Sequence, residues 1–181
     1  MKYAKALERI RSGAMTRMDL AALRENAIAK VAAGDRDAED IVSAITQAKP
    51  ADAYVLFMGF CPGGDFNDRQ DIEWKAKGIC RFDYVESTQQ LERFNGVCVG
   101  DLVVLKKREQ FGKTMELFGH GRAKSIAYDE RKVRYLVMDW SDQSEVIEVP
   151  LMGCNSTVDV RTIEAVEGEM PDEFWGWLGM R

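Results

Sequence analysis

The sequence predicts an α+β protein: a helical segment at residues 1–49, followed at 50–181 by a small, strongly bent antiparallel β-barrel with short helices. In the first segment, apolar residues recur at three- and four-residue spacing, which is typical of amphipathic helices. Residues 100–140 contain three strand-like runs separated by short polar breaks, which is typical of antiparallel strands that follow one another. The middle run has two glycines around the only histidine, which favours a bend or a bulge at a corner of the sheet.

The sequence pattern of residues 1–49 predicts three helices. Ala4–Arg11 is the first, and a Ser-Gly pair ends it. Thr16 and Asp19 have the spacing of a capping box, with Asp in the place of the usual Glu, so a second helix begins there. A third ends at Pro50. So small a segment cannot fold alone, and we expect it to pack on the rest of the chain, on a second copy as a homodimer, or on a protein partner. A DNA-reading helix-turn-helix is less favoured, because the third helix is acidic at its start.

Tyr54–Phe60 is the most hydrophobic run of the chain and predicts a central strand. It leads into residues 61–69, a loop rich in Gly, Pro, Asp and Asn. Because this loop is long, polar and contains a phenylalanine, we interpret it as a binding loop rather than a simple connection. A strand at 78–84 and a short helix capped by Ser87 follow.

The rest of the barrel is predicted from residues 102–163. Residues 102–105 are apolar throughout, as in a strand buried on both faces, and three basic residues follow them directly. The other expected strands are 115–124, 133–140, 145–150 and 157–163. A terminal helix begins at Pro171. We expect its aromatic side chains to seal the barrel: Phe174, Trp175 and Trp177.

Composition limits the classes of protein. No apolar run of the 181 residues approaches the length of a transmembrane helix, and the N-terminus has no apolar signal core, so we expect a cytoplasmic protein without membrane contact. The four cysteines lie far apart and never as Cys-x-x-Cys. We therefore expect reduced thiols, no metal site and no cofactor.

Charge is unevenly distributed along the chain. The net charge of −5 argues against indiscriminate binding to duplex nucleic acid. Residues 105–134 nevertheless contain nine basic and four acidic side chains, a net charge of +5, whereas residues 141–181 carry −7. A basic patch on an acidic body favours a local anionic ligand, although the same charges would also serve to solvate two hairpin turns.

The order of motifs resembles the PUA-like superfamily and, within it, the EVE-like domains that recognise modified bases. The resemblance depends on Gly100-Asp101 before an apolar strand, on Gly119-His120-Gly121, and on a strand that ends at Trp140. It covers about residues 53–165. The chain departs from the EVE-like pattern at residues 60–63, where Phe-Cys-Pro-Gly replaces a strand that runs into Asn-Pro. The resemblance implies a pseudo-barrel that binds nucleic acid, a nucleotide-like anion or one flipped, modified base by recognition rather than turnover.

A flipped base requires an aromatic face, polar groups for its edge and cations for the flanking phosphates. The candidate stacking residues are Phe60, Phe66, Trp74 and Trp140. The candidate edge readers are Asp65, Asn67, Asp71 and Asn155. The candidate phosphate contacts are Lys106, Lys107, Arg108, Lys113, Arg122 and Lys124. Phe60 and Trp140 also fit a core, and Asp65 and Asn67 also fit an ordinary turn. Trp74, which is flanked by charged residues, is the aromatic residue that we expect to be exposed.

Two other function classes stay open. A small hydrolase or nucleotide-processing enzyme would use His120 with a loop thiol, Cys61 or Cys154. The chain has no Walker motif, no GxSxG and no HExxH, which favours binding over catalysis. A protein–protein adaptor in phage–host conflict would use the helical segment and the acidic C-terminal region.

Overall fold

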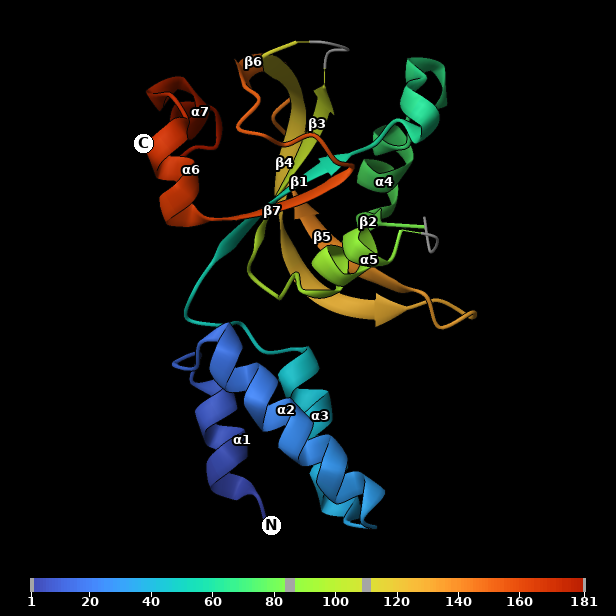
Figure 1. The fold of residues 1–181 in the computed structure, drawn as a ribbon, viewed down its shortest axis with the longest axis vertical. Coiled ribbons are helices and arrows are strands. Elements are labelled where there is room, and N and C mark those ends of the chain that lie inside the picture. Colours follow the sequence, from blue (N-terminus) through green and yellow to red (C-terminus); the bar gives the residue numbers. More distant parts are fainter. Residues whose placement is uncertain (1, 84–86, 109–111, 181) are drawn as a thin grey trace. The chain divides into compact units, whose positions relative to one another are not determined.

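The structure is a computed structural model, which describes residues 2–83, 87–108 and 112–180. The chain forms two compact units, residues 1–53 with 98–100 and residues 54–97 with 101–181 (Figure 1). The first unit contains the expected helical segment, and the second contains the sheet.

The first unit has helices α1 (Ala4–Arg11), α2 (Arg17–Ala32) and α3 (Glu39–Thr46). The predicted capping box is present: the Thr16 side chain accepts a hydrogen bond from the Asp19 backbone N–H, and the Asp19 side chain accepts one from the Thr16 N–H. One buried apolar cluster joins the three helices: Leu7, Ile10, Met15, Leu20, Ala27, Ile41 and Ala48.

The second unit is built on one mixed sheet. Its strands are β1 (Tyr54–Gly59), β2 (Ile79–Arg81), β3 (Leu102–Arg108), β4 (Thr114–Tyr128), β5 (Arg134–Trp140), β6 (Ile147–Pro150) and β7 (Val158–Thr162). The order is β2-β5-β4-β3-β1-β7, and β6 pairs with β4 on the edge opposite β3. Strands β1 and β3 run parallel, and the other pairs are antiparallel.

The α+β class is confirmed, but the expected closed, wholly antiparallel barrel is wrong. The sheet is open, because its path ends at β2 on one side and at β7 on the other. Strand β2 has only three residues, which is too short to continue a barrel wall. The parallel pair arises because the chain passes through α4, β2 and α5 between β1 and β3, and a crossover of that length permits parallel pairing.

The bend predicted around the glycines is present. The pairing of β3 with β4 shifts register between Leu105 and Lys106, opposite residues 117–119, so one residue of β4 is extra. Two positions later, the backbones of β4 and β5 approach closely at Gly121, where a Cβ atom would lie 2.6 Å from the Asp139 carbonyl oxygen. Figure 1 shows β4 curving strongly along its 15 residues.

Short helices cover the sheet: α4 (Asp71–Lys77), α5 (Thr88–Asn95), α6 (Ile163–Glu169) and α7 (Asp172–Trp177). The aromatic residues of α7 are buried, as expected, but they pack on a face of an open sheet, where the Phe174 ring lies 6.3 Å from that of Phe57 on β1. Among the described residues, none of the helices has the length and apolar character needed to cross a membrane.

Candidate functional site

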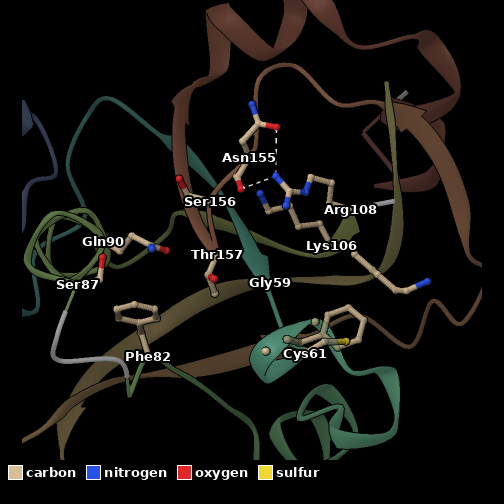
Figure 2. Close-up of a pocket in the computed structure, with 14 residues that line it drawn as sticks. Gly59, Cys61, Phe82, Ser87, Gln90, Lys106, Arg108, Asn155, Ser156 and Thr157 are labelled. Atoms are coloured by element: carbon tan, nitrogen blue, oxygen red, sulfur yellow. Dashed lines mark hydrogen bonds between the residues drawn. The ribbon is translucent and has the colours of Figure 1, made fainter. Parts of the chain in front are cut away.

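A cleft of about 810 Å³ opens at the carboxyl ends of the parallel strands β1 and β3 (Figure 2). Parallel neighbours deliver the loops that follow them to the same edge of a sheet, which is why ligands so often bind there. The cleft is lined by Gly59, Phe60, Cys61, Gly63, Gly64, Phe82, Ser87, Gln90, Lys106, Lys107, Arg108, Asn155, Ser156 and Thr157. All of these residues belong to the second unit.

A buried ion pair forms the floor of the cleft. The Lys106 Nζ lies 2.6 Å from an Asp159 carboxylate oxygen, and their side chains are only 2% and 6% exposed. Lys106 also donates to the Cys154 carbonyl oxygen at 2.6 Å, and the same Asp159 oxygen accepts from the Ser156 N–H at 2.9 Å. Burial lowers the pKa of Lys106, against the raising effect of Asp159. The pair therefore ties the end of β3 to residues 154–156.

The segment before β7 forms the upper wall in Figure 2. The Arg108 guanidinium donates to the Asn155 backbone oxygen at 3.0 Å and approaches its side-chain oxygen at 3.4 Å. The Gly59 N–H donates to the Thr157 carbonyl oxygen at 2.7 Å, which holds this segment against the end of β1. A Cβ atom at Gly59 would lie 3.4 Å from Thr157, so this segment packs directly on the end of β1.

Helix α5 and Phe82 form the opposite wall. The Gln90 side-chain oxygen accepts a hydrogen bond from the Val158 N–H at 3.0 Å, which anchors the helix to β7. Arg93, one turn further along, donates to the Val158 carbonyl oxygen at 3.3 Å and lies 3.6 Å from Asp159. Phe82 is buried, and its ring lies 6.1 Å from that of Phe94 on the same helix.

The loop after β1 carries a cluster of rings around one guanidinium. Arg69 lies 5.5 Å from the ring centroid of Phe60, 4.7 Å from that of Phe66 and 5.2 Å from that of Phe118. Its nitrogens donate to both carboxylate oxygens of the buried Asp71, at 2.7 and 2.6 Å. The Lys107 Nζ lies 4.9 Å from the Phe66 centroid. This cluster holds the binding loop against the rim of the cleft.

The cleft is electropositive. Its described lining contains three cationic side chains, from residues 106–108, and no carboxylate. Asp159 neutralises the buried Lys106, so the charge available to a ligand comes from Lys107 and Arg108, which are half-buried and exposed. Lys107 also lies 3.2 Å from Glu116, itself half-buried. The rim therefore presents two cations to an anion, one of which, Lys107, is also paired with Glu116.

The structure brings five of the expected ligand residues to this cleft: Phe60, Lys106, Lys107, Arg108 and Asn155. Within this group, Lys106, expected to contact a phosphate, has a buried ammonium group that is bonded to Asp159 and to the Cys154 carbonyl oxygen. Phe66 is 39% exposed and lies beside the cleft, because its ring is 6.4 Å from that of Phe60 and 4.9 Å from the Lys107 Nζ, and both of these residues line the cleft.

Other expected residues have local roles. Asp65 accepts hydrogen bonds from the Asn67 backbone N–H and side-chain amide, at 2.9 and 3.0 Å, so these two residues stabilise their own turn. The expectation that Trp74 is exposed is wrong: it is 3% exposed, and the outer side of α4 is occupied by Glu73 and Lys77. Asp71 is buried against Arg69.

The remaining candidates lie outside the lining of the cleft. Trp140 is half-buried beside a different cavity, formed by residues 75–78 and 141–144, and donates to the Trp74 carbonyl oxygen. Lys113, Arg122 and Lys124 have exposed side chains, and the last two belong to β4.

The thiols and the histidine of the enzyme alternative occupy different environments. His120 packs edge-on against Trp177 at 4.7 Å, and burial lowers its pKa. Cys61 lines the cleft, where burial raises its pKa, and burial also raises that of Cys154. Neither thiol hydrogen-bonds to His120 among the residues that the structure describes. Raised pKa values disfavour the reactive thiolate.

Several cleft residues were not anticipated: Phe82, Ser87, Gln90, Ser156 and Thr157. Gln90 had a usable signal, because it lies four residues before the buried Phe94 and so on the inward face of its helix. The others are brought to the cleft by tertiary pairing, which has no local sequence signal.

In the described parts of the chain, no group of three or more His, Cys, Asp or Glu residues is placed to bind a metal ion. Comparison with models of protein families, with curated proteins and with solved structures finds no match.

Proposed function

We propose that this protein is a recognition module that binds a nucleotide-like anion in the cleft, either a free nucleotide or a nucleotide within a nucleic acid strand, without turning it over. The observation that carries the proposal is the convergence of Lys107 and Arg108 on a polar and aromatic hollow whose described lining has no carboxylate. An anion placed there meets Lys107 and Arg108, while the nearby carboxylates Asp159 and Glu116 are each paired with a lysine.

Size and polarity support the same ligand class. A volume of about 810 Å³ lies within the range of roughly 300–1,000 Å³ for small-ligand pockets. One end carries the cations and Asn155, and the other carries Phe82, Ser87 and Gln90 (Figure 2). A nucleotide has the matching division, with its phosphate at the cationic end and its base at the amide-bearing end. The resemblance to modified-base-binding PUA-like domains favours a ligand of this kind.

Binding without turnover is favoured by the chemistry of the lining. Cys61 is the only thiol among the lining residues, and burial raises its pKa, so the thiolate needed for nucleophilic attack is disfavoured. His120, the only histidine of the chain, is not among the described lining residues.

The test is a titration of mononucleotides and of short single- and double-stranded oligonucleotides, plain and base-modified, at two salt concentrations. We expect affinity to fall with salt, and Lys107→Ala or Arg108→Ala each to weaken binding by about 1–3 kcal/mol, the scale of a charge-assisted hydrogen bond. For a strand, each substitution should also reduce the salt slope by about one.

Lys124→Ala is the matched control, because it removes an exposed cation of β4 that does not line the cleft. The affinity of this variant for nucleotides and oligonucleotides should equal that of the unmodified protein. Absence of binding for every nucleotide and oligonucleotide would show the proposal to be wrong. So would equal losses in the Lys124 and Arg108 variants. Preference for strands over mononucleotides decides between the two sources of the ligand.

A further inference from the structure

We propose that Gln90 determines the specificity of the cleft, and that it selects a base whose exposed edge carries hydrogen-bond acceptors, as the keto edges of guanine and uracil do. The inference rests on the proposed function and names the ligand class more closely.

The orientation of the Gln90 amide is fixed by its partner. The Val158 backbone N–H lies 3.0 Å from one atom of this amide. A backbone N–H can only donate, so the amide atom that faces it is the oxygen. This partner therefore settles which end of the Gln90 amide is oxygen and which is nitrogen. The amide nitrogen then carries two N–H donors, which have no hydrogen-bond partner among the described residues.

The position of Gln90 is fixed as well. It belongs to α5 and is half-buried, and the buried Phe94 one turn later anchors the same face of the helix. Figure 2 shows its amide end projecting from α5 beside Ser87 and Phe82, on the side of the cleft away from Arg108. A base bound there with its phosphate at Arg108 would present an edge to the two donors.

The Asn155 amide and the Ser156 hydroxyl of the cleft already have partners within the protein. The Asn155 side chain approaches Arg108 through its oxygen and the Gly153 carbonyl through its nitrogen, both at 3.4 Å. The Ser156 hydroxyl is approached by Arg93 at 3.5 Å. Gln90 is therefore the amide best placed to read a base.

Donors alone discriminate between bases. A free glutamine binds adenine through both its oxygen and its nitrogen, using N6 and N7. With the oxygen turned toward the Val158 N–H, the amide presents its N–H donors to the ligand. These donors match O6 and N7 of guanine or O4 of uracil, whereas the amino groups of adenine and cytosine would face them donor to donor. An unpaired donor in a partly buried site costs affinity.

The experiment measures the affinities of GMP, AMP, UMP and CMP for the full chain and for two variants. Gln90→Glu keeps an oxygen for the Val158 N–H but replaces the two donors by a carboxylate oxygen. Gln89→Glu adds the same charge on an exposed neighbour in the same helix. We expect the unmodified protein to bind GMP over AMP, and UMP over CMP, by at least about fivefold. Gln90→Glu should abolish that preference and weaken GMP binding at least about fivefold more than Gln89→Glu does.

Equal affinity for GMP and AMP in the unmodified protein would overturn the inference, and so would equal effects of the two variants. Both results leave nucleotide binding itself intact, so they are distinguishable from failure of the proposed function. If no nucleotide binds to the unmodified protein, the proposed function and this inference both fall.

Discussion

The floor of the cleft and the face beneath α7 each bury an ionisable side chain, and the two side chains differ in the number of their hydrogen-bond partners. Lys106 is surrounded by partners: a carboxylate oxygen of Asp159 and the Cys154 carbonyl oxygen, each at 2.6 Å. His120 packs against the Trp177 ring, and its Nε2 is buried without a hydrogen-bond partner among the described residues. Where partners surround the group, the cleft can retain a buried charge. Where they do not, burial lowers the pKa of the group and favours its uncharged form.

The largest effect should come from removing the carboxylate at the cleft. Asp159→Ala leaves the Lys106 ammonium buried without its counter-charge and removes the acceptor of the Ser156 N–H. We expect a loss of about 3–5 kcal/mol in the free energy of unfolding, the usual result of breaking a buried ion pair from one side. Denaturant-induced unfolding measures it.

The double variant Lys106→Met with Asp159→Leu is the control for that prediction. Two apolar side chains of similar size should recover most of the lost stability, because neither leaves a charge unpaired. If Asp159→Ala unfolds at the same denaturant concentration as the unmodified protein, the buried pair does not stabilise the floor of the cleft.

A smaller effect is expected at the binding loop. Arg69→Ala removes both hydrogen bonds to Asp71, whose side chain is 2% exposed. It also removes the contacts of the guanidinium with three aromatic rings. We expect the free energy of unfolding to fall by about 1–3 kcal/mol, since a buried carboxylate loses its donors. Thermal and denaturant unfolding should agree.

Arg81→Ala is a closely matched control for this substitution. Arg81 pairs with an aspartate two residues later, Asp83, which is 43% exposed, and also lies 3.3 Å from Asp129, which is 23% exposed. Both carboxylates keep more of their hydration than the buried Asp71 does when the arginine is removed. Its loss of stability should be the smaller of the two. Equal losses in both variants would show that burial of the Asp71 carboxylate is not what makes its pair important.

The same contrast shows what the sequence could predict. Local patterns identified the capping box at Thr16, the strand at 102–105 and the bulge beside Gly119, because each depends on residues close in the chain. The fate of Lys106 depends on Asp159, 53 residues later, and no local pattern indicates that partner. The parallel pairing of β1 and β3, which places the cleft, has the same origin.

Side-chain direction was the second source of error. Trp74 was expected to be exposed because charged residues flank it, yet only Glu73 and Lys77 among them lie on the outer face of α4, and the tryptophan is buried. Gln90 was missed although its four-residue spacing from Phe94 placed it on the inner face of α5. Helical spacing predicts the direction of both side chains correctly, whereas the charge of the neighbouring residues does not.

The smallest effect concerns His120, and here the sign of the pH dependence follows from the direction of its pKa. Burial lowers the pKa of His120 below 6.5, and the positive charges of Lys75 and Arg122 lower it further, while a hydrogen bond with the Trp177 backbone acts in the opposite direction. As the pH falls through 6.5, the unfolded chain binds a proton that the folded protein resists, so stability should be full above that pH and decline below it until the folded pKa is reached. His120→Gln should flatten this part of the stability curve, and NMR titration of the only histidine should give a pKa below 6.5 in the folded protein. A pKa at or above 6.5, or an unchanged stability profile in His120→Gln, would remove the contrast with Lys106, because both buried groups would then keep their protons.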